Sequence, residues 1–599
     1  MAETPSSPIK SSIAAALREA ASPSPSAPSS GSAEKTAGGA NNAPPPPSDF
    51  VTLKLDGREV QAKKGTNLLE VCLQHGIDVS YFCYHPGLSS PAVCRQCLVE
   101  VVGQPKLVPA CYTPVADKMD VRTGTPRVLD VRRQMLEFTL INHPVDCPIC
   151  DKAGECSLQK HYQSWDHESS RSSTPKVHKP KVQDIGPHIM LDAERCILCS
   201  RCVRVCDEVA GVKQLTMAWR GDREQLTVAP GHKLDNPYSL NTVDVCPVGA
   251  LTSKDFRFTM RAWELFTTDS VCPGCATGCN IEIHHAQGEI WRLVPRENLQ
   301  VNKYWMCDEG RFAYKDVRHK RLASSRLGMG HGQPAQITSI DKAVAFAAER
   351  MDRLASQGAT LGLVFSAHVT NEALFALSLL VTRLVSRGAE VRTYVTGTAP
   401  RPERADNILR HADTNPNTAG ARLFAGPHAG DAQTLLADLE RKRLKCVWMV
   451  GTELPLSESA QMEAAPLFDG LELFVCQAVQ DTPILRRAHV QLPAAAWAEV
   501  DGTFTNARHM VQRIRKSVNP QGDARSHLEL ISLFAKKAKW AIDEKWQVSA
   551  RQAFLHMVGQ VTAQPPGTEP KPELVAGFGK AEWGKNSLPV QRRFAHSQG

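Results

Sequence analysis

The chain has 599 residues, of which 42% are hydrophobic, so it is long enough to form several domains with apolar cores. Its net charge of +8 arises from 70 basic and 62 acidic residues without a basic block, which argues against a nucleic-acid-binding protein. We find no apolar stretch typical of a signal peptide and no run of about 18 apolar residues, so we expect neither a secretory leader nor a transmembrane helix.

Nineteen cysteines are the most unusual feature of the composition. Many of them are separated by only two or three residues, which is too close for a disulfide framework in a large protein. In a chain of this length, such clusters are typical of metal binding in a reducing compartment.

The two ends of the chain have low-complexity compositions. Residues 1–49 are mostly Ala, Pro, Ser and Gly, with PPPP at 44–47. Such a segment cannot bury enough apolar surface to offset its chain entropy, so we predict a disordered tail with a marginal short helix over residues 12–19. Residues 561–599 are rich in Pro and Gly and are predicted to be a surface tail.

Residues 50–127 are predicted to form a ferredoxin-like domain of the β-grasp type. Residues 50–55 and 59–62 alternate as strands across the hairpin signal Asp56-Gly57, and residues 67–75 follow as an amphipathic helix. Strand, turn, strand, helix and then a cysteine loop is the order in which this fold presents a 2Fe–2S cluster. The cysteines have the spacing C-x10-C-x2-C-x13-C: Cys83, Cys94, Cys97 and Cys111.

This cysteine loop differs from that of plant-type ferredoxins, which reads C-x4-C-x2-C. The first gap is longer here, so we predict a variant 2Fe–2S loop. A zinc ribbon is the alternative for the same four residues. Cys72 lies on the apolar face of the predicted helix and is interpreted as a core residue.

Residues 128–180 are predicted to be an iron–sulfur domain with one histidine ligand. Apolar residues recur at helical spacing over 126–142, and this helix would deliver His143 to the motif HPVDCPICDKAGEC. A lone histidine is usually structural, but one that precedes three closely spaced cysteines is better interpreted as a ligand. It would remove a negative charge from the ligand set and alter the potential of a cluster. The set is His143, Cys147, Cys150 and Cys156.

Residues 157–190 are polar and contain four further histidines. No spacing pairs them, so no additional histidine ligand is predicted. We interpret all four side chains as solvated: His161, His167, His178 and His188.

Residues 181–264 are predicted to be a ferredoxin-like 4Fe–4S domain. A C-x2-C-x2-C motif with a distant Cys-Pro holds three corners of a 4Fe–4S cube and takes the fourth from elsewhere, whereas zinc sites usually have two separate C-x2-C knuckles. Cys206 is an alternative fourth ligand, but Asp207 follows it, whereas Pro247 follows Cys246. The preferred set is Cys196, Cys199, Cys202 and Cys246.

Residues 265–325 contain a fourth set with the spacing C-x2-C-x3-C-x27-C. Residues 281–295 between its members read as two short strands across a turn at 286–288. We therefore predict a small cluster-bearing β domain, with a zinc ribbon as the alternative. The set is Cys272, Cys275, Cys279 and Cys307.

Residues 326–560 lack clustered cysteines and alternate between helical and strand-like patterns. This alternation predicts an α/β domain with a largely parallel sheet. Cys446 and Cys476 fall inside apolar runs and are interpreted as core residues. The helical patterns are 341–354 and 371–386, and the strand-like runs are 361–365, 446–450 and 473–476.

No nucleotide, flavin or quinone motif is found. The stretch LGMGHG at 327–332 lacks a preceding strand and a full G-x-G-x-x-G, so we discount it as a nucleotide loop. We therefore predict no catalytic residue and no organic-cofactor-binding residue, and hydride chemistry would take place on a partner.

The order of the four sets, with HPVDCPICDKAGEC second, resembles the large iron–sulfur subunit of bacterial proton-pumping NADH:quinone oxidoreductase (respiratory complex I), known as its G subunit. This resemblance covers about residues 50–320. Further on, SAHVTNEAL at 366–374 and LPAAAWAEVDGTFTNARHMVQ at 492–512 are similar to the molybdopterin oxidoreductase family. The implied fold is multidomain, α+β and α/β: a β-grasp 2Fe–2S ferredoxin, a one-His/three-Cys and a ferredoxin-like 4Fe–4S domain, then a 4Fe–4S domain of molybdopterin-oxidoreductase type (265–325) and a molybdopterin-oxidoreductase-like domain.

The resemblance also implies the cofactors, namely one 2Fe–2S cluster on the first set and three 4Fe–4S clusters on the other three. The cluster on Cys272, Cys275, Cys279 and Cys307 is kept by only some bacterial members and is placed off the main electron route. The C-terminal domain is expected to be a scaffold without molybdenum or pterin.

The implied function is that of an electron-wire subunit in the peripheral arm of this oxidoreductase. A flavin- and NADH-binding subunit would lie upstream, and iron–sulfur and quinone-site subunits downstream, with only indirect contact to the membrane arm. Electrons would pass through the His-ligated and second 4Fe–4S clusters, with the 2Fe–2S cluster as a side branch. The expected location is peripheral, on the cytoplasmic side of the inner (cell) membrane, without nucleic-acid partners.

Other classes share parts of this pattern. An iron-only hydrogenase would need a further cysteine-rich domain, but beyond Cys307 only Cys446 and Cys476 remain. A molybdenum formate dehydrogenase would need a catalytic Cys or selenocysteine and a longer chain. An electron-transfer subunit of a soluble NAD-linked hydrogenase or formate dehydrogenase complex stays as the main alternative, and a zinc-stapled interaction protein is the non-redox one.

Overall fold

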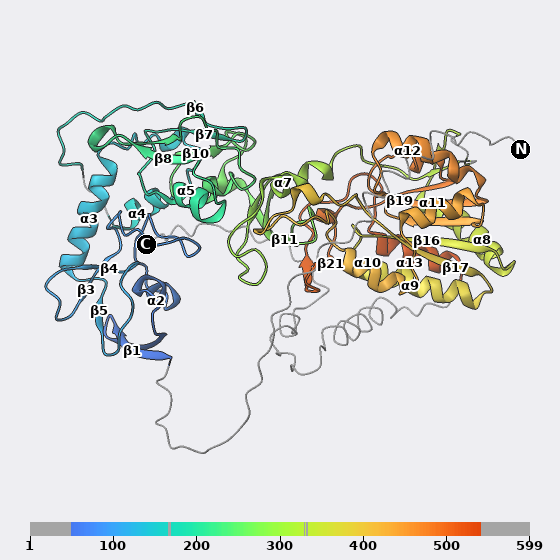
Figure 1. The fold of residues 1–599 in the computed structure, drawn as a ribbon, viewed down its shortest axis with the longest axis horizontal. Coiled ribbons are helices and arrows are strands. Elements are labelled where there is room, and N and C mark those ends of the chain that lie inside the picture. Colours follow the sequence, from blue (N-terminus) through green and yellow to red (C-terminus); the bar gives the residue numbers. More distant parts are fainter. Residues whose placement is uncertain (1–48, 166–168, 329, 331–332, 541–599) are drawn as a thin grey trace, which may run out of the picture. The chain divides into compact units, whose positions relative to one another are not determined.

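The computed structural model describes residues 49–165, 169–328, 330 and 333–540. These residues form two compact units, one up to residue 264 and one from residue 265 (Figure 1). The predicted tails, the short helix over 12–19, His167 and the last part of the predicted α/β domain lie outside the described residues, as does part of 327–332. No helix in the described ranges is both long and apolar enough to cross a membrane.

The first unit begins with a five-stranded sheet and one helix, which confirms the β-grasp prediction. Strand β1 pairs antiparallel with β2 and parallel with β5. Asp56 and Gly57, with φ of 47° and 82°, form the tight turn between β1 and β2. The strands, in the sheet order β2-β1-β5-β3-β4, are Arg58–Lys63, Phe50–Leu55, Asp120–Arg122, Leu98–Val101 and Val108–Pro109.

Helix α2 (Leu68–Gln74) is packed against this sheet. The side chain of Asn67 accepts a hydrogen bond from the Glu70 amide at 2.9 Å, which caps the helix N-terminus. Leu68, Leu69, Val71 and Cys72 are buried, so the interpretation of Cys72 as core is confirmed.

Helix α3 (Pro126–Leu140) confirms the helix predicted ahead of His143. Thr125 caps it and Pro126 occupies its first turn, as expected for a helix start. Helix α4 (Ser157–Trp165) packs against it, and the Arg132 guanidinium lies 4.4 Å from the ring centre of Trp165. The loop that contains His143 and its three cysteines connects these two helices.

The prediction that the histidines of 157–190 are solvated is wrong for His161. It lies on the inner face of α4, 5% exposed, with its ring 5.2 Å from that of Phe82. Burial lowers its pKa to about 4, so the ring is neutral and is accommodated in the core. His178 is exposed as predicted, and His188 is half-buried.

The rest of the first unit consists of short elements around long loops. Strands β6 (Gln183–Asp184), β7 (Ile189–Leu191) and β10 (Leu251–Ser253) form one small sheet. Strands β8 (Leu215–Ala218) and β9 (Gln225–Val228) form a hairpin. Helix α5 (Arg201–Arg204) continues into a π-helical turn (Val205–Val209), and α6 (Asn241–Val245) ends directly before Cys246.

The second unit opens with an antiparallel sheet, β11 (Phe266–Val271), β12 (Asn280–Ala286) and β13 (Glu289–Pro295). The two predicted strands are therefore confirmed, and β11 is an addition. Gln287 and Gly288, with φ of 55° and 79°, form the turn between β12 and β13.

A seven-stranded sheet follows, and it confirms the predicted α/β architecture. Five neighbouring strands are parallel, and the edge strands β14 and β15 are antiparallel. In sheet order the strands are β15 (Gln336–Ile337), β14 (Arg326–Leu327), β20 (Val490–Pro493), β19 (Leu473–Ala478), β18 (Cys446–Val450), β16 (Thr360–Ser366) and β17 (Glu390–Thr396).

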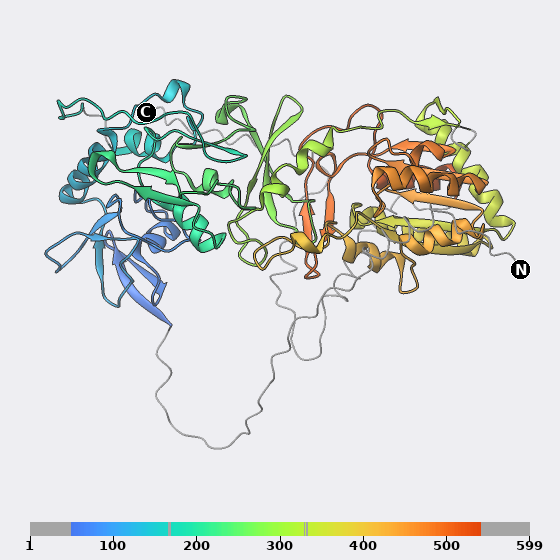
Figure 2. The ribbon, with the colours of Figure 1, turned by 45° about the horizontal axis from the view of Figure 1, so that its top comes forward.

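Helices cover both faces of this sheet (Figure 2). One face packs against α8 (Ile340–Ser356), α9 (Asn371–Ser386), α10 (Thr418–Ala425) and α13 (His527–Lys537). The other packs against α11 (Ala432–Glu440) and α12 (Glu458–Ala464). Cys446 and Cys476 are buried in these two cores, as predicted. The hairpin of β21 (Gly502–Thr505) and β22 (Val511–Ile514) completes the unit.

Candidate metal centres

The first set of cysteines lies in the loops at one end of the β-grasp sheet. The thiol of Cys83 is within hydrogen-bonding distance of those of Cys94 and Cys111, and Cys111 also contacts Cys97. The backbone amides of residues 93 and 94 point at the Cys83 sulfur. Ala92 and Arg95 adopt left-handed conformations, with φ of 52° and 53°, which bend the loop around the sulfurs. The four predicted ligands are thus brought together.

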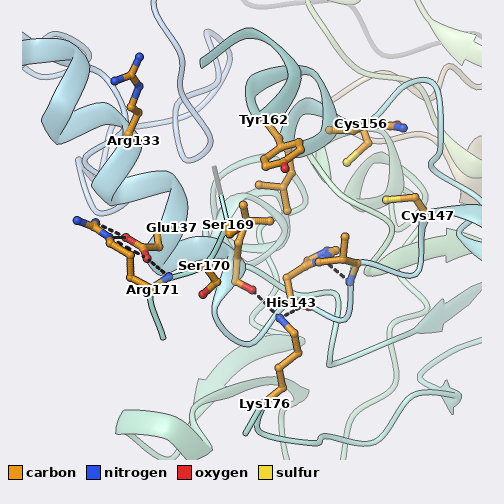
Figure 3. A pocket seen from close by; sticks show the side chains of 14 residues that line it. Arg133, Glu137, His143, Cys147, Cys156, Tyr162, Ser169, Ser170, Arg171 and Lys176 are labelled. Carbon is orange, nitrogen blue, oxygen red and sulfur yellow. Dashed lines mark hydrogen bonds and ion pairs between the residues drawn. The ribbon is translucent and has the colours of Figure 1, made fainter. Parts of the chain in front are cut away.

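The second set follows helix α3. Lys176 donates hydrogen bonds to the carbonyls of Leu140, Ile141 and His143 at 2.9, 2.9 and 2.8 Å, and the first two of these residues end helix α3. Figure 3 shows Lys176 beside His143. A cation at a helix C-terminus satisfies carbonyls that have no partner within the helix and favours the helix dipole. Lys176 therefore holds the loop that presents His143, a role that no sequence pattern indicated.

His143 is buried and its ring is held by the following residues. The Val145 amide donates to His143 Nδ1 at 3.1 Å. Burial lowers the pKa of the imidazole to about 4, so the ring is neutral and retains one lone pair. That lone pair is on Nδ1 and faces the amide, so the ring proton is on Nε2. Iron at Nδ1 would take the lone pair, and iron at Nε2 would move the proton to Nδ1, so binding at either nitrogen would break this contact.

A cavity of about 440 Å³ adjoins this histidine (Figure 3). Three of the four predicted ligands of the set line it: His143, Cys147 and Cys156. The fourth, Cys150, is buried beside the loop that follows Cys246. The soft thiol donors with one imidazole, together with open space between them, fit a cluster of several irons.

Gly249 determines whether Cys150 keeps its place. A Cβ atom at residue 249 would lie 2.3 Å from the Cys150 sulfur, closer than non-bonded atoms approach. We predict that Gly249→Ala displaces Cys150 and removes one 4Fe–4S cluster, which lowers the iron content from about fourteen to about ten atoms per chain. Iron analysis with EPR of the reduced protein measures this.

Gly124→Ala is the matched control, because a Cβ there meets nothing within 4 Å and lies in the same unit. Equal iron contents in the two variants would show that the Cys150 sulfur does not need this space.

The third set is Cys196, Cys199, Cys202 and Cys246. Cys246 lies within electrostatic range of the other three. Burial raises the pKa of Cys199 to about 11 and that of Cys196 to about 12, so without a cation these thiols stay protonated. Leu198 and Ser200 are left-handed, with φ of 53° and 59°, and the backbone amides of residues 198 and 201 face the sulfurs.

Cys206 lies within electrostatic range of Cys202 but has hydrogen-bond partners of its own. Its thiol is hydrogen-bonded to the Asn236 side chain and to the backbone of Leu215. Burial raises its pKa to about 12. Because these partners engage the Cys206 thiol, Cys246 stays our prediction for the fourth ligand.

The fourth set lies between the β11–β12 connection and helix α7 (Asp308–Arg311). Cys307 caps α7 by accepting a hydrogen bond from the Gly310 amide at 3.4 Å, and the Gly274 amide donates to Cys272 at the same distance. A Cβ at Gly310 would come within 3.0 Å of Cys272 and 3.4 Å of Cys307. The positive charge of the buried Arg404 guanidinium lowers the pKa of both of these thiols and so favours their thiolate form. Cys275 and Cys279 are buried beside them.

Within the described ranges, no group of three or more His, Cys, Asp or Glu side chains is arranged to hold a single metal ion. In a 4Fe–4S cluster each ligand binds a different iron, and in a 2Fe–2S cluster the four cysteines are divided between two irons, so each whole set spreads wider than the ligands of one ion. The observation therefore concerns single-ion sites only.

Five family models match the chain. They are described as a 2Fe-2S iron-sulfur cluster binding domain (48–126), the NADH-ubiquinone oxidoreductase-G iron-sulfur binding region (132–171), the ferredoxin-like domain of NADH-quinone oxidoreductase subunit 3 (186–252), the molybdopterin oxidoreductase Fe4S4 domain (266–319) and molybdopterin oxidoreductase (428–537). These matches define the class: a multidomain iron–sulfur protein with a molybdopterin-oxidoreductase-like domain.

Curated relatives narrow this class. The chain is 37% identical over 61% of its length to the NADH-ubiquinone oxidoreductase 75 kDa subunit of Reclinomonas americana, and 34% identical over 68% to the G subunit of NADH-quinone oxidoreductase from Streptomyces coelicolor. It covers 53% and 47% of these proteins, so it spans about half the length of the relatives it matches. The chain is a homologue of the G subunits of NADH-quinone oxidoreductases.

A distant structural neighbour is an NAD+-reducing [NiFe]-hydrogenase in its H2-reduced state. It is 29% identical with a TM-score of 0.33, and the match covers 35% of this chain and 90% of that one.

Proposed function

We propose that this chain is an electron-wire subunit of the peripheral arm of an NADH:quinone oxidoreductase, with the domain boundaries predicted from the sequence. One observation carries the proposal: fifteen cysteines and one histidine gather in four separate and largely buried sets, and all of these cysteines are free thiols. The homology to the G subunits of such oxidoreductases supports the same interpretation.

The proposed ligand sets are the four described above, with a 2Fe–2S cluster on the first and a 4Fe–4S cluster on each of the others. A cluster bound at such a site supplies one-electron chemistry at a potential set by its ligands, hydrogen bonds and burial. The chain would contribute the thiolates and the imidazole, amide donors directed at the sulfurs of Cys83 and Cys272, and largely buried surroundings.

The proposed partners would supply the nucleotide, flavin and quinone sites for which this chain shows no sequence motif. A flavin- and NADH-binding subunit would deliver electrons, and iron–sulfur and quinone-site subunits would receive them near the cytoplasmic face of the membrane. Subunits that co-purify with the chain test this. Recovery of a hydrogenase or formate dehydrogenase catalytic subunit in their place would favour the alternative complex.

We propose that the molybdopterin-like domain binds no molybdenum. In open α/β sheets, ligands bind at the carboxyl ends of strands where the strand order reverses, here between β16 and β18. That position holds the Ser366 hydroxyl, which donates to Glu453 at 2.6 Å, and Gly451, whose Cβ would lie 2.4 Å from Ser366. Contacts within the chain thus connect the ends of β16 and β18, and metal analysis showing stoichiometric molybdenum would contradict the proposal.

Iron and acid-labile sulfide measured on anaerobically purified protein provide the main test. We expect about fourteen irons per chain, the sum of one two-iron and three four-iron clusters. The reduced protein should give EPR signals of both cluster types. A colourless, EPR-silent protein that contains zinc would end the electron-transfer proposal.

A further inference from the structure

The ten residues between Cys83 and Cys94 form an unusually long first gap for a ferredoxin loop, where the plant-type loop has four. We call residues 84–93 the strap. Most of their backbone groups lie outside any helix or strand. The strap is nevertheless held at two places by side chains more than 100 positions further along the chain.

The first place is Tyr84, which follows Cys83 directly. The Arg201 guanidinium donates to the Tyr84 carbonyl and, through its other terminal nitrogen, to the Val245 carbonyl at 3.0 Å. Val245 precedes Cys246. One buried guanidinium thus joins the residue after the first ligand of the first set to the residue before the last ligand of the third set.

The second place is Ser89, near the middle of the strap. Arg204 donates to its carbonyl, and Glu208 accepts from its hydroxyl and, at 2.8 Å, from its amide. The carbonyl, the amide and the hydroxyl of this one residue are therefore all engaged by side chains of α5 and the π-helical turn.

Arg204 also contacts the two ligand sets themselves. Its Nη2 donates to the Cys83 carbonyl at 2.5 Å and lies 3.5 Å from the Cys199 carbonyl. A guanidinium stays charged at all physiological pH values and presents several donors in a fixed fork, so it suits a junction of several carbonyls. A positive charge at this place favours the addition of negative charge to both sets.

We propose that residues 84–93 are a docking strap that fastens the first ligand set to the third, and that Arg204 is a positioning residue shared by both. Through its contacts, Arg204 fixes the separation of the two sets. Through its charge, it raises the reduction potentials of the clusters that both would hold, because reduction adds an electron near a cation. The second part rests on the proposed function, whereas the strap itself does not.

Hydrogen exchange of the full-length protein tests the strap. In Glu208→Ala, the Ser89 amide loses a hydrogen bond to a charged acceptor, so its exchange should accelerate about tenfold. Asp207→Ala is the control, because Asp207 is an exposed carboxylate on the same turn. An unchanged exchange rate over residues 84–93 in Glu208→Ala would contradict the proposal that the strap is fastened by this residue.

Redox titration followed by EPR tests the shared charge. In Arg204→Met, the midpoints of the 2Fe–2S signal and of one 4Fe–4S signal should both become more negative. Arg204→Lys keeps the charge and should restore both toward the parent values, and the exposed Arg220→Met should change neither. A shift of one signal alone would show that Arg204 is not shared, and no recovery with lysine would show that its charge does not set the two potentials.

The two parts fail separately. If Arg204→Met does not assemble its clusters, the comparison of Arg204→Lys with the parent decides, since the lysine should leave both midpoints near their parent values. If the parent protein contains no iron, the proposed function fails, and the exchange of the Ser89 amide still decides whether the strap is fastened.

Discussion

Cys246→Ala is expected to abolish one 4Fe–4S cluster and to leave about ten irons per chain instead of about fourteen. Cys246 is the only member of its set that lies far from the C-x2-C-x2-C motif, and it approaches all three thiols of that motif. Without it, one corner iron has no protein ligand. Iron analysis and EPR of the reduced variant measure the loss.

Cys206→Ala is the matched comparison, because Cys206 is a buried cysteine of the same domain and a rival ligand by sequence. Its thiol contacts Asn236 and Leu215, so all clusters should remain in this variant. The reverse result, with iron lost from Cys206→Ala and retained in Cys246→Ala, would assign the fourth ligand to Cys206.

Glu499→Gln is expected to destabilise the second unit by about 3–5 kcal/mol, because it leaves a buried arginine without its counter-charge. The side chains of Glu499 and Arg321 are 0% and 2% exposed, and Arg321 Nη2 lies 2.7 Å from Glu499 Oε2. The same carboxylate accepts from the Ala496 amide at 2.8 Å. Equilibrium unfolding in denaturant would measure the change in the free energy of unfolding.

Two variants sharpen this experiment. Glu463→Gln removes an exposed carboxylate of the same unit and should change stability by less than about 0.5 kcal/mol. Replacing both partners, as in Arg321→Met with Glu499→Leu, removes the unpaired charge and should recover much of the loss. An equal loss in the double variant and in Glu499→Gln would mean that packing, rather than charge, explains the effect.

Much of the fold followed from local patterns. The strand at 50–55, the helix at 371–386 and the strand at 446–450 lie where hydrophobic periodicity placed them. Each of these segments has a continuous pattern over a full element, so its own side chains report which face is buried. His161 was misjudged because the apolar face of α4 carries few apolar residues, and a neutral imidazole replaces one of them.

The sequence alone predicted which cysteines belong to each closely spaced ligand motif and in which order the domains follow one another. Ligands separated by two or three residues are held close together by the chain itself. The spacing of Cys196, Cys199 and Cys202 therefore predicts an iron–sulfur site without knowledge of the fold. The Cys-Pro signal also named Cys246 as their partner, whereas only the tertiary structure placed Gly249 against Cys150 and Arg204 between two ligand sets. These distances join residues remote in sequence, and they depend on how the elements between them pack.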